Sequence, residues 1–277
     1  MTDINKEYKM IVLDLDDTLL KDDHTISSRT KEALMQAQKN GVKVVLASGR
    51  PTYGMVPIAN ELKLADYGSF ILSFNGAKII NSKTNEEMYS STLSPEQLHE
   101  LYHVSQRENV GIHTYMENDI VTEANNEYTM IEGEITGMPV IEVERFVDAV
   151  DEPCVKALMV GHPDRLVEVE KKLQEEFRGQ LSVMRSKPYF LEFTEDGVTK
   201  GTSLHSLITK LGIKQEEVIA MGDSYNDQTM IEFAGLGVAM GNAPDDIKEI
   251  ADYVTDTNMN DGVAKVVEEF VLNKVTK

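Results

Sequence analysis

The chain has 277 residues, of which 41% are hydrophobic, and a formal charge of −20 from 27 Lys and Arg against 47 Asp and Glu. This length is enough for one large domain or two, and the apolar fraction is ordinary for a soluble globular protein. The negative charge excludes nucleic acid and anionic membranes as expected partners, because both would be repelled at long range.

The chain in order begins with MTDINKEYKM, which lacks the basic start and apolar stretch of a signal peptide. No apolar run approaches the roughly 20 residues that span a bilayer. The single cysteine, Cys154, cannot form an intramolecular disulfide and favours a reducing compartment. We therefore expect a cytoplasmic protein with no membrane partner.

The first 80 residues alternate between predicted strands and helices. Strands are predicted over 9–15, 42–47 and 69–74, and helices over 29–40 and 53–62. Ser27 or Ser28 can cap the first helix. This order is typical of a doubly wound parallel sheet, in which ligands bind beyond the carboxyl ends of the strands. Asp14 and Ser48 fall at such ends.

The middle of the chain has longer polar helices, 94–109 and 163–177, and alternating strands such as 110–116 and 154–161. The end repeats the first pattern, with helices over 201–213, 226–235, 244–252 and 262–275 and strands over 217–223, 236–241 and 253–255. We predict an α/β protein with a Rossmann-like, doubly wound parallel sheet as its core, residues 1–85 and 191–277. An α+β cap domain, residues 86–190, is inserted into it.

The segment MIVLDLDDTLL, residues 10–20, places three carboxylates at the end of an apolar strand. Burying neighbouring unpaired carboxylates is costly. Residues two apart lie on the same side of a strand, so Asp14 and Asp16 can converge on one ligand. Mg²⁺ takes hard oxygen ligands and would relieve their repulsion. For an isolated pair, a solvent-facing acidic loop would be the alternative.

A second acidic pair lies in MGDSYND. Asp227 falls in a predicted first helical turn, where helix capping alone would explain a carboxylate. Capping does not explain Asp223, which ends an apolar strand. Two acidic clusters at strand ends of one parallel sheet therefore favour a metal site.

Two further segments supply positive charge and hydrogen-bond donors. Ser48 and Gly49 are predicted to open a helix whose free N–H groups can hold an anion. Lys200 precedes another helix. Each alone is typical of ordinary capping or of a solvated lysine. Together with the two carboxylate pairs, they make up the set of groups that phosphoryl transfer requires.

These segments resemble a known family. DLDDT, Ser48 in LASGR, Lys200 in TKGTSL and GDSYND are similar, in order, to the four motifs of the haloacid-dehalogenase superfamily. ASGRP, FNGA, KPYFLEF and AMGNAPDDIKEIAD resemble its Cof-type sugar-phosphatase branch, which has the larger α/β cap. The similarity runs along nearly the whole chain and is weakest in the cap. Asp17 stands where the family more often has glycine.

The resemblance implies a Mg²⁺-dependent phosphatase that hydrolyses small phosphorylated metabolites, sugar phosphates foremost, through an aspartyl-phosphate. It makes Asp14 the nucleophile and Asp16 the general acid and then the base. The phosphate would be held by Ser48, Gly49, Lys200 and Asn226. The metal would be held by Asp14, the backbone carbonyl of Asp16 and Asp223, with Asp227 supporting the site.

Three other functions are alternatives to this one. A signalling receiver module has no acid in the position of Asp16 and no cap, and a dehalogenase is not acidic at that position. A phosphomutase keeps both aspartates and stays open as the alternative. Specificity is expected from the cap, where four polar or aromatic residues are candidates: His113, Tyr115, Arg185 and Tyr189.

Overall fold

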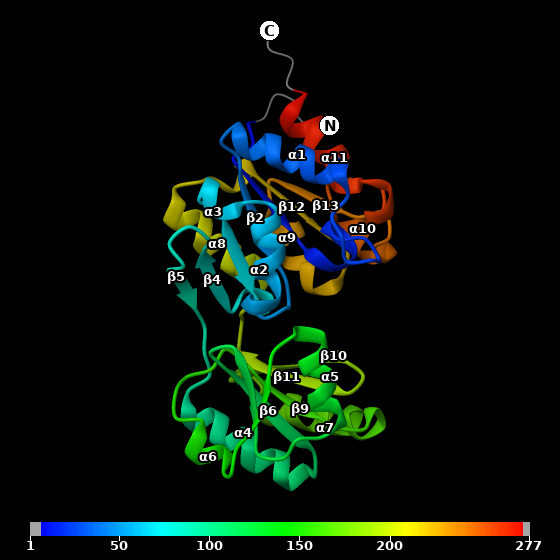
Figure 1. Ribbon diagram of the computed structural model, residues 1–277. Coiled ribbons are helices and arrows are strands. Elements are labelled where there is room, and N and C mark those ends of the chain that lie inside the picture. Colours follow the sequence, from blue (N-terminus) through cyan, green and yellow to red (C-terminus); the bar gives the residue numbers. More distant parts are fainter. Residues whose placement is uncertain (1–6, 274–277) are drawn as a thin grey trace. The chain divides into compact units, whose positions relative to one another are not determined.

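The computed structural model describes residues 7–273 and divides into two compact units, each with its own sheet (Figure 1). The core unit runs up to Tyr89 and resumes at Thr199, and the cap unit is Ser90–Val198. The cap was expected over residues 86–190. The difference arises because β5 (Glu87–Ser90) joins the core sheet, whereas β11 (Phe190–Glu195) pairs with β9 and β10 of the cap sheet.

The core sheet has eight strands in the order β14-β13-β12-β1-β2-β3-β4-β5. Neighbours from β14 to β3 are parallel, which confirms the predicted doubly wound α/β class, and β4 runs antiparallel to β3. Besides β5, the strands are β1 (Met10–Leu13), β2 (Lys43–Ala47), β3 (Phe70–Ser73), β4 (Lys78–Asn81), β12 (Val218–Gly222), β13 (Leu236–Ala239) and β14 (Tyr253–Val254).

Helices cover both faces of the core sheet, and alternate residues of β1 pack against each. Ile11 and Leu13 face the side of α1, α2 and α11, while Met10 and Val12 face the side of α8 and α9. The core helices are α1 (Ser28–Lys39), α2 (Thr52–Glu61), α3 (Leu64–Tyr67), α8 (Lys200–Leu211), α9 (Gln228–Phe233), α10 (Asp245–Ile250) and α11 (Gly262–Val267). A strand packed on both faces carries an apolar run, as β1 does.

The ends of two core helices show how far local signals define them. The side chain of Ser27 accepts a hydrogen bond from the Thr30 N–H and caps α1, as predicted. The last helix, predicted over 262–275, ends as α11 at Val267 and continues as a wider turn over Glu268–Leu272. Positions 274 and 275 of that prediction lie outside the described residues.

The cap sheet has six strands in the order β10-β11-β9-β6-β7-β8. All neighbours are antiparallel except β7 and β8, which are parallel. Besides β11, the strands are β6 (Gly111–Met116), β7 (Asp119–Thr122), β8 (Val140–Glu142), β9 (Ala157–Val160) and β10 (Leu181–Lys187). The helices are α4 (Pro95–Glu108), α5 (Glu127–Thr136), α6 (Phe146–Ala149) and α7 (Pro163–Glu176).

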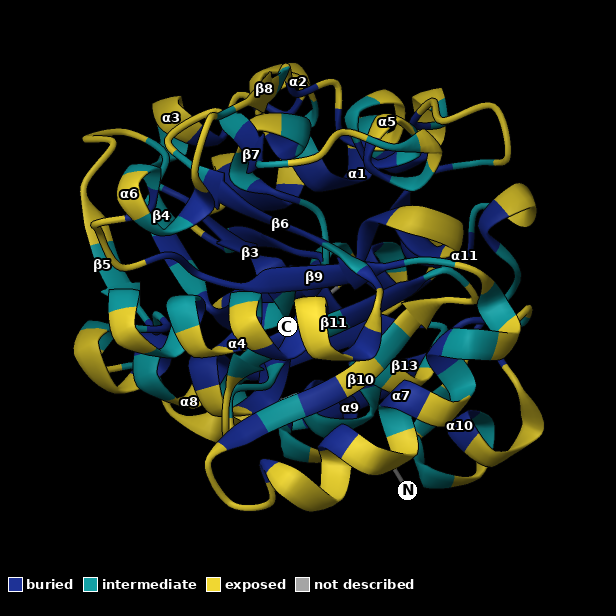
Figure 2. Ribbon diagram, turned by 90° about the horizontal axis from the view of Figure 1, so that it is seen from below, coloured by how far each residue is buried: buried dark blue, intermediate teal, exposed yellow. Residues whose placement is uncertain are grey.

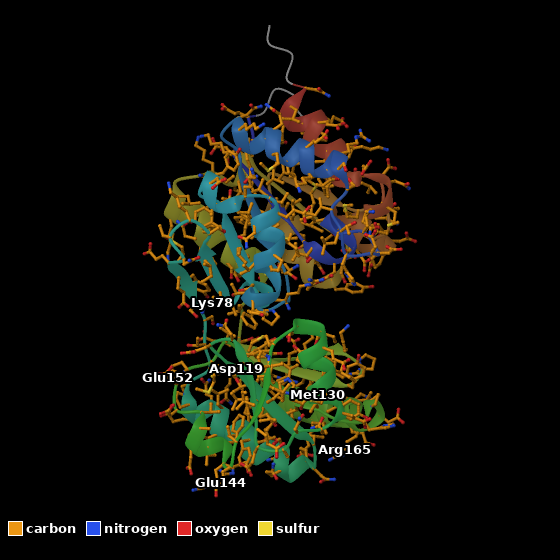
Figure 3. All side chains as sticks on the ribbon, viewed as in Figure 1. Lys78, Asp119, Met130, Glu144, Glu152 and Arg165 are labelled. Carbon is orange, nitrogen blue, oxygen red and sulfur yellow. The ribbon has the colours of Figure 1, made fainter. Side chains whose placement is uncertain are left out.

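Helices α4, α6 and α7 share an apolar cluster with one face of the cap sheet, and Figure 2 shows their outer turns exposed above buried strands. Helix α5 carries Thr129 and Glu132, which contact His113 and Tyr115 of β6, and it also bears the exposed Met130 labelled in Figure 3. No helix within residues 7–273 is long and apolar enough to cross a bilayer.

Candidate active site

The predicted site residues of the core lie at the carboxyl edge of its sheet. Asp14 follows β1, Ser48 follows β2 and Asp223 follows β12. Because β12, β1 and β2 are parallel neighbours, their carboxyl ends lie side by side. Lys200 is the first residue of α8, which begins after the capping Thr199.

Lys200 joins two carboxylates inside the protein. Its Nζ lies 2.5 Å from Asp14 Oδ1 and 2.6 Å from Asp227 Oδ1, and its side chain is fully buried. Burial alone would lower the pKa of Lys200, but the two carboxylates outweigh burial and raise it. The lysine therefore stays cationic. It supplies the local positive charge that an anion site needs in so acidic a protein.

Asp14, Asp223 and Asp227 each offer a carboxylate oxygen, and these atoms lie within 4.8 Å of one another. Burial, and then the nearby Asp227 charge, raise the pKa of Asp14 well above its usual range. Burial also raises the pKa of Asp223 to about 6. One lysine does not balance three clustered carboxylates, and a hard divalent cation would. The donor set therefore fits a magnesium-type ion.

Asp227 is the most constrained of the three. Its Oδ2 accepts the backbone N–H groups of Asp223 and Ser224, both at 3.0 Å, while its Oδ1 accepts Lys200. Both oxygens are thus already engaged. Asp227 is well suited to fixing Lys200 and the turn after β12, and it is the least available of the three as a metal ligand.

The Asp16 carboxylate is not part of the cluster formed by Asp14, Asp223 and Asp227. Strand β1 ends at Leu13, and Asp16 lies in a turn over Leu15–Leu19, where alternation no longer applies. Asp16 binds Arg50 through two hydrogen bonds, with Arg50 Nε 2.9 Å from Oδ2 and Nη2 2.5 Å from Oδ1. Arg50 is a site residue that was not predicted.

Asp17 adopts a backbone conformation that favours glycine, the residue expected at this position from the family resemblance. Its φ of 60° lies in the left-handed region, which favours glycine but which Asp also tolerates. The Asp17 carbonyl accepts a hydrogen bond from Asn242 Nδ2 at 2.8 Å. Asp17, Asp22 and Asp223 line a pocket of about 420 Å³, whose other lining residues are Asn242, Thr257, Asn258 and Met259. The charge of Asp17 is a further reason for the raised pKa of Asp223.

Ser48 and Gly49 were predicted to open a helix, but they lie in the loop before α2. Pro51 disfavours helical conformation at Arg50, so α2 begins only at Thr52. Ser48 is buried, and its Oγ accepts the Arg50 N–H at 3.1 Å. Any anion held here is held by loop donors, because the N-terminus of α2 lies further along the chain.

Two other contacts were not foreseen. Thr18 Oγ1 donates to Asp223 Oδ1 at 2.8 Å and orients that carboxylate. Asn226 Nδ2 donates to Asn75 Oδ1 at 3.0 Å. Asn75 belongs to the FNGA segment, so the sequence signal for it was the Asn-Gly dipeptide, which is typical of left-handed turns.

The four cap candidates prove to have other contacts. His113 and Tyr115 are buried, 0% and 4% exposed, and Tyr115 donates to Glu132 at 2.5 Å. They lie beneath α5 and cannot meet a ligand at the surface. Arg185 is paired with Glu170 at 2.7 Å. Tyr189 is half-buried and stacks on the ring of Tyr128.

Comparisons with known proteins identify the family of the chain. The family model for haloacid dehalogenase-like hydrolases matches residues 11–267. A solved haloacid dehalogenase-like hydrolase from Bacteroides thetaiotaomicron is 46% identical, with a TM-score of 0.89 over 95% of this chain and 99% of that one. The chain therefore belongs to the haloacid dehalogenase-like hydrolase family.

Relatives in this family are phosphatases, and this chain is an enzyme of that kind. The 5-amino-6-(5-phospho-D-ribitylamino)uracil phosphatase YcsE of Bacillus subtilis is 33% identical over 268 residues, covering 96% of this chain and 97% of its own. The sugar phosphatase BT4131, of subclass IIB of the superfamily, has a solved structure that is 28% identical with a TM-score of 0.77, covering 95% of this chain and 98% of its own.

Proposed function

We propose that the protein is a Mg²⁺-dependent phosphatase that hydrolyses small phosphorylated metabolites, sugar phosphates foremost, through an aspartyl-phosphate on Asp14. The observation that carries the proposal is the buried cluster of Lys200 with Asp14 and Asp227, next to Asp223. It combines a nucleophile, a fixed cation and a metal-type donor set at one edge of the sheet.

Asp14 is the nucleophile. Lys200 engages Oδ1, and no described residue donates a hydrogen bond to the second oxygen, Oδ2. That oxygen is available to attack phosphorus, forming an O–P bond as the ester O–P bond breaks. Water then attacks the phosphorus of the aspartyl-phosphate and regenerates the Asp14 carboxylate with release of inorganic phosphate.

Asp16 is the general acid and then the base. It donates a proton to the leaving alcohol oxygen and afterwards takes one from the attacking water. Its two hydrogen bonds to Arg50 occupy both carboxylate oxygens. Each oxygen keeps a second lone pair, so the pairing with Arg50 orients Asp16 without excluding the proton.

The phosphate is held by the Ser48 hydroxyl, the Gly49 N–H, Lys200 and Asn226. Mg²⁺ would be held by Asp14, Asp223 and the Asp16 carbonyl, with Asp227 in support. When bound, Mg²⁺ neutralises charge on the carboxylates and on the transferring phosphoryl group.

The substrate class follows from the relatives and from the cap. YcsE is named for a phosphorylated ribitylamino compound and BT4131 for sugar phosphates, and both kinds of substrate carry a phosphate ester on a polyhydroxylated chain. We assign the choice of leaving group to the cap unit, which is a separate compact unit with its own sheet.

Phosphate release from a panel of sugar phosphates and from p-nitrophenyl phosphate tests the function. Chelator should abolish release and Mg²⁺ restore it, whereas Ca²⁺, with longer bonds and more ligands, should support it poorly. Asp14→Asn keeps the shape but removes the attacking charge, so release should fall at least about 100-fold. Asp66→Asn, an exposed change on α3, serves as the matched control.

Retention of more than a few per cent of activity by Asp14→Asn would rule out Asp14 as the nucleophile. Full release in excess chelator would contradict the metal requirement. Product analysis is part of the same assay. An isomerised sugar phosphate without free phosphate would identify a phosphomutase.

A further inference from the structure

Three consecutive residues after β3 have positive φ angles: Phe74 at 53°, Asn75 at 55° and Gly76 at 99°. A left-handed aromatic residue is a genuine outlier, and each non-glycine residue in this region is costly. Such strain persists only where the surroundings hold it. The segment is therefore held in place by specific contacts.

Those contacts come from the proposed phosphate-binding loops. The Asn75 N–H donates to the Ser48 carbonyl at 2.9 Å, and the Phe74 N–H donates to the Arg50 carbonyl at 3.0 Å. Ser203 Oγ on α8 donates to the Gly76 carbonyl at 2.7 Å. A Cβ on Gly76 would lie 2.6 Å from Ser203 Oγ, so only glycine fits there.

The Asn75 side chain lies between two of the residues assigned to the phosphate. Its Oδ1 accepts a hydrogen bond from Asn226 Nδ2, at 3.0 Å. A Cβ built on Gly49 would lie 3.2 Å from both amide heteroatoms of Asn75, so this side chain also packs against the Gly49 backbone. The loops after β2 and β12 are separated in sequence by more than half of the chain, and Asn75 joins them.

We propose that Asn75 is a positioning residue for phosphate binding, which fixes Asn226 and Gly49 in register so that both reach the same anion. The inference rests on the proposed function for the identity of the anion. The left-handed backbone of residues 74–76 brings the side chain to this point, and the three backbone contacts with Ser48, Arg50 and Ser203 hold it there.

The test is the affinity for inorganic phosphate, measured by calorimetry on the full chain with Mg²⁺ present. Asn75→Gly removes the amide but keeps the left-handed backbone. Loss of one positioning hydrogen bond should weaken phosphate binding about tenfold. Asn85→Gly is the matched control, because Asn85 also has a φ of 55° but is exposed in the turn between β4 and β5.

A double-mutant cycle shows whether Asn75 acts through its neighbour. If it does, Asn75→Gly should weaken phosphate binding less than about twofold in an Asn226→Ala background, because the hydrogen bond between the two side chains is already lost. Full additivity would overturn action through Asn226. A merely structural role would lower the melting temperature of Asn75→Gly and leave phosphate affinity unchanged, which also overturns the proposal.

A second variant covers the case in which Asn75→Gly does not fold. Asn75→Asp keeps an acceptor and a residue that tolerates the left-handed region, but it places negative charge beside the anion. It should weaken phosphate binding more than tenfold, and wild-type affinity would overturn the proposal. Wild-type protein that binds phosphate but hydrolyses no ester refutes only the hydrolase. Wild-type protein that binds no phosphate overturns both.

Discussion

Among the single residues of the site, Asp16 is one whose side chain is paired with a residue that was not predicted, Arg50. Arg50 occupies both of its carboxylate oxygens, and the pair is partly exposed, with Arg50 26% and Asp16 47% accessible. A carboxylate that accepts two hydrogen bonds from one guanidinium is held in a fixed orientation. Arg50 therefore orients the Asp16 carboxylate.

The role of Asp16 predicts a dependence on the leaving group. Asp16→Asn should slow hydrolysis of a sugar phosphate far more than that of an activated aryl phosphate, whose leaving group needs no proton. Phosphorylated Asp14 should accumulate, because the base for water is missing. Single-turnover kinetics on both esters, with acid trapping of the acyl phosphate, measure this. Equal losses without trapped intermediate would make Asp16 structural.

The sequence could predict which residues lie at the carboxyl edge, because apolar runs mark the strands and acidic residues follow them. It could not predict the direction of the Asp16 side chain, because β1 ends at Leu13 and alternation does not extend into the turn over Leu15–Leu19. Arg50 and Thr18 were also beyond prediction. Their partners lie 34 and 205 positions away, and no local pattern encodes such pairs.

At the scale of elements, α8 positions the cation of the site. Lys200 is its first residue, and the helix packs against α9 through Gly201, whose added Cβ would collide with the carbonyl of Thr229. The apolar pattern predicted this helix, whereas its close approach to α9 depends on the tertiary packing. The helix predicted over 53–62 is confirmed as α2, Thr52–Glu61, whereas Ser48 and Gly49 lie in the loop before it.

The packing of α8 leads to a prediction for Gly201→Ala. The added methyl group must move α8 away from α9 and carry Lys200 with it, so kcat should fall at least about tenfold. The free energy of unfolding should decrease by about 1–3 kcal/mol. Thr209→Ala, at an exposed position of the same helix, is the control and should change both by little. Wild-type kcat in Gly201→Ala would show that the position of Lys200 tolerates this shift.

At the scale of the whole molecule, stability should depend on pH through a histidine buried in the cap. Burial, and then the charge of Lys156, lower the pKa of His113 to about 3. An unfolded chain binds this proton near pH 6.5. The free energy of unfolding is therefore unaffected by this group above pH 6.5, and it decreases progressively as the pH falls from 6.5 toward 3.

Urea unfolding of wild type and of His113→Gln, compared between pH 7.5 and pH 5, measures this loss. The free energy of unfolding of the wild type should decline relative to the variant by about 1.4 kcal/mol for each pH unit below 6.5. Thr129 lies 3.3 Å from the His113 Nδ1, so Thr129→Val disturbs the same site without titrating. A constant difference between wild type and His113→Gln would contradict the buried neutral histidine.

The strand order of the core sheet also bears on how the protein is made on the ribosome. Strand β1 lies between β2 and β12, and β12 follows β1 by about 200 residues, which take roughly 10 to 40 s to synthesise. During that time β1 has β2 beside it and an open edge on the other side. The cap unit, which is complete by Val198, emerges before that edge can close. The nascent chain thus exposes the strand that precedes Asp14 until its last quarter is made. This is the interval in which a chaperone would have the most to protect.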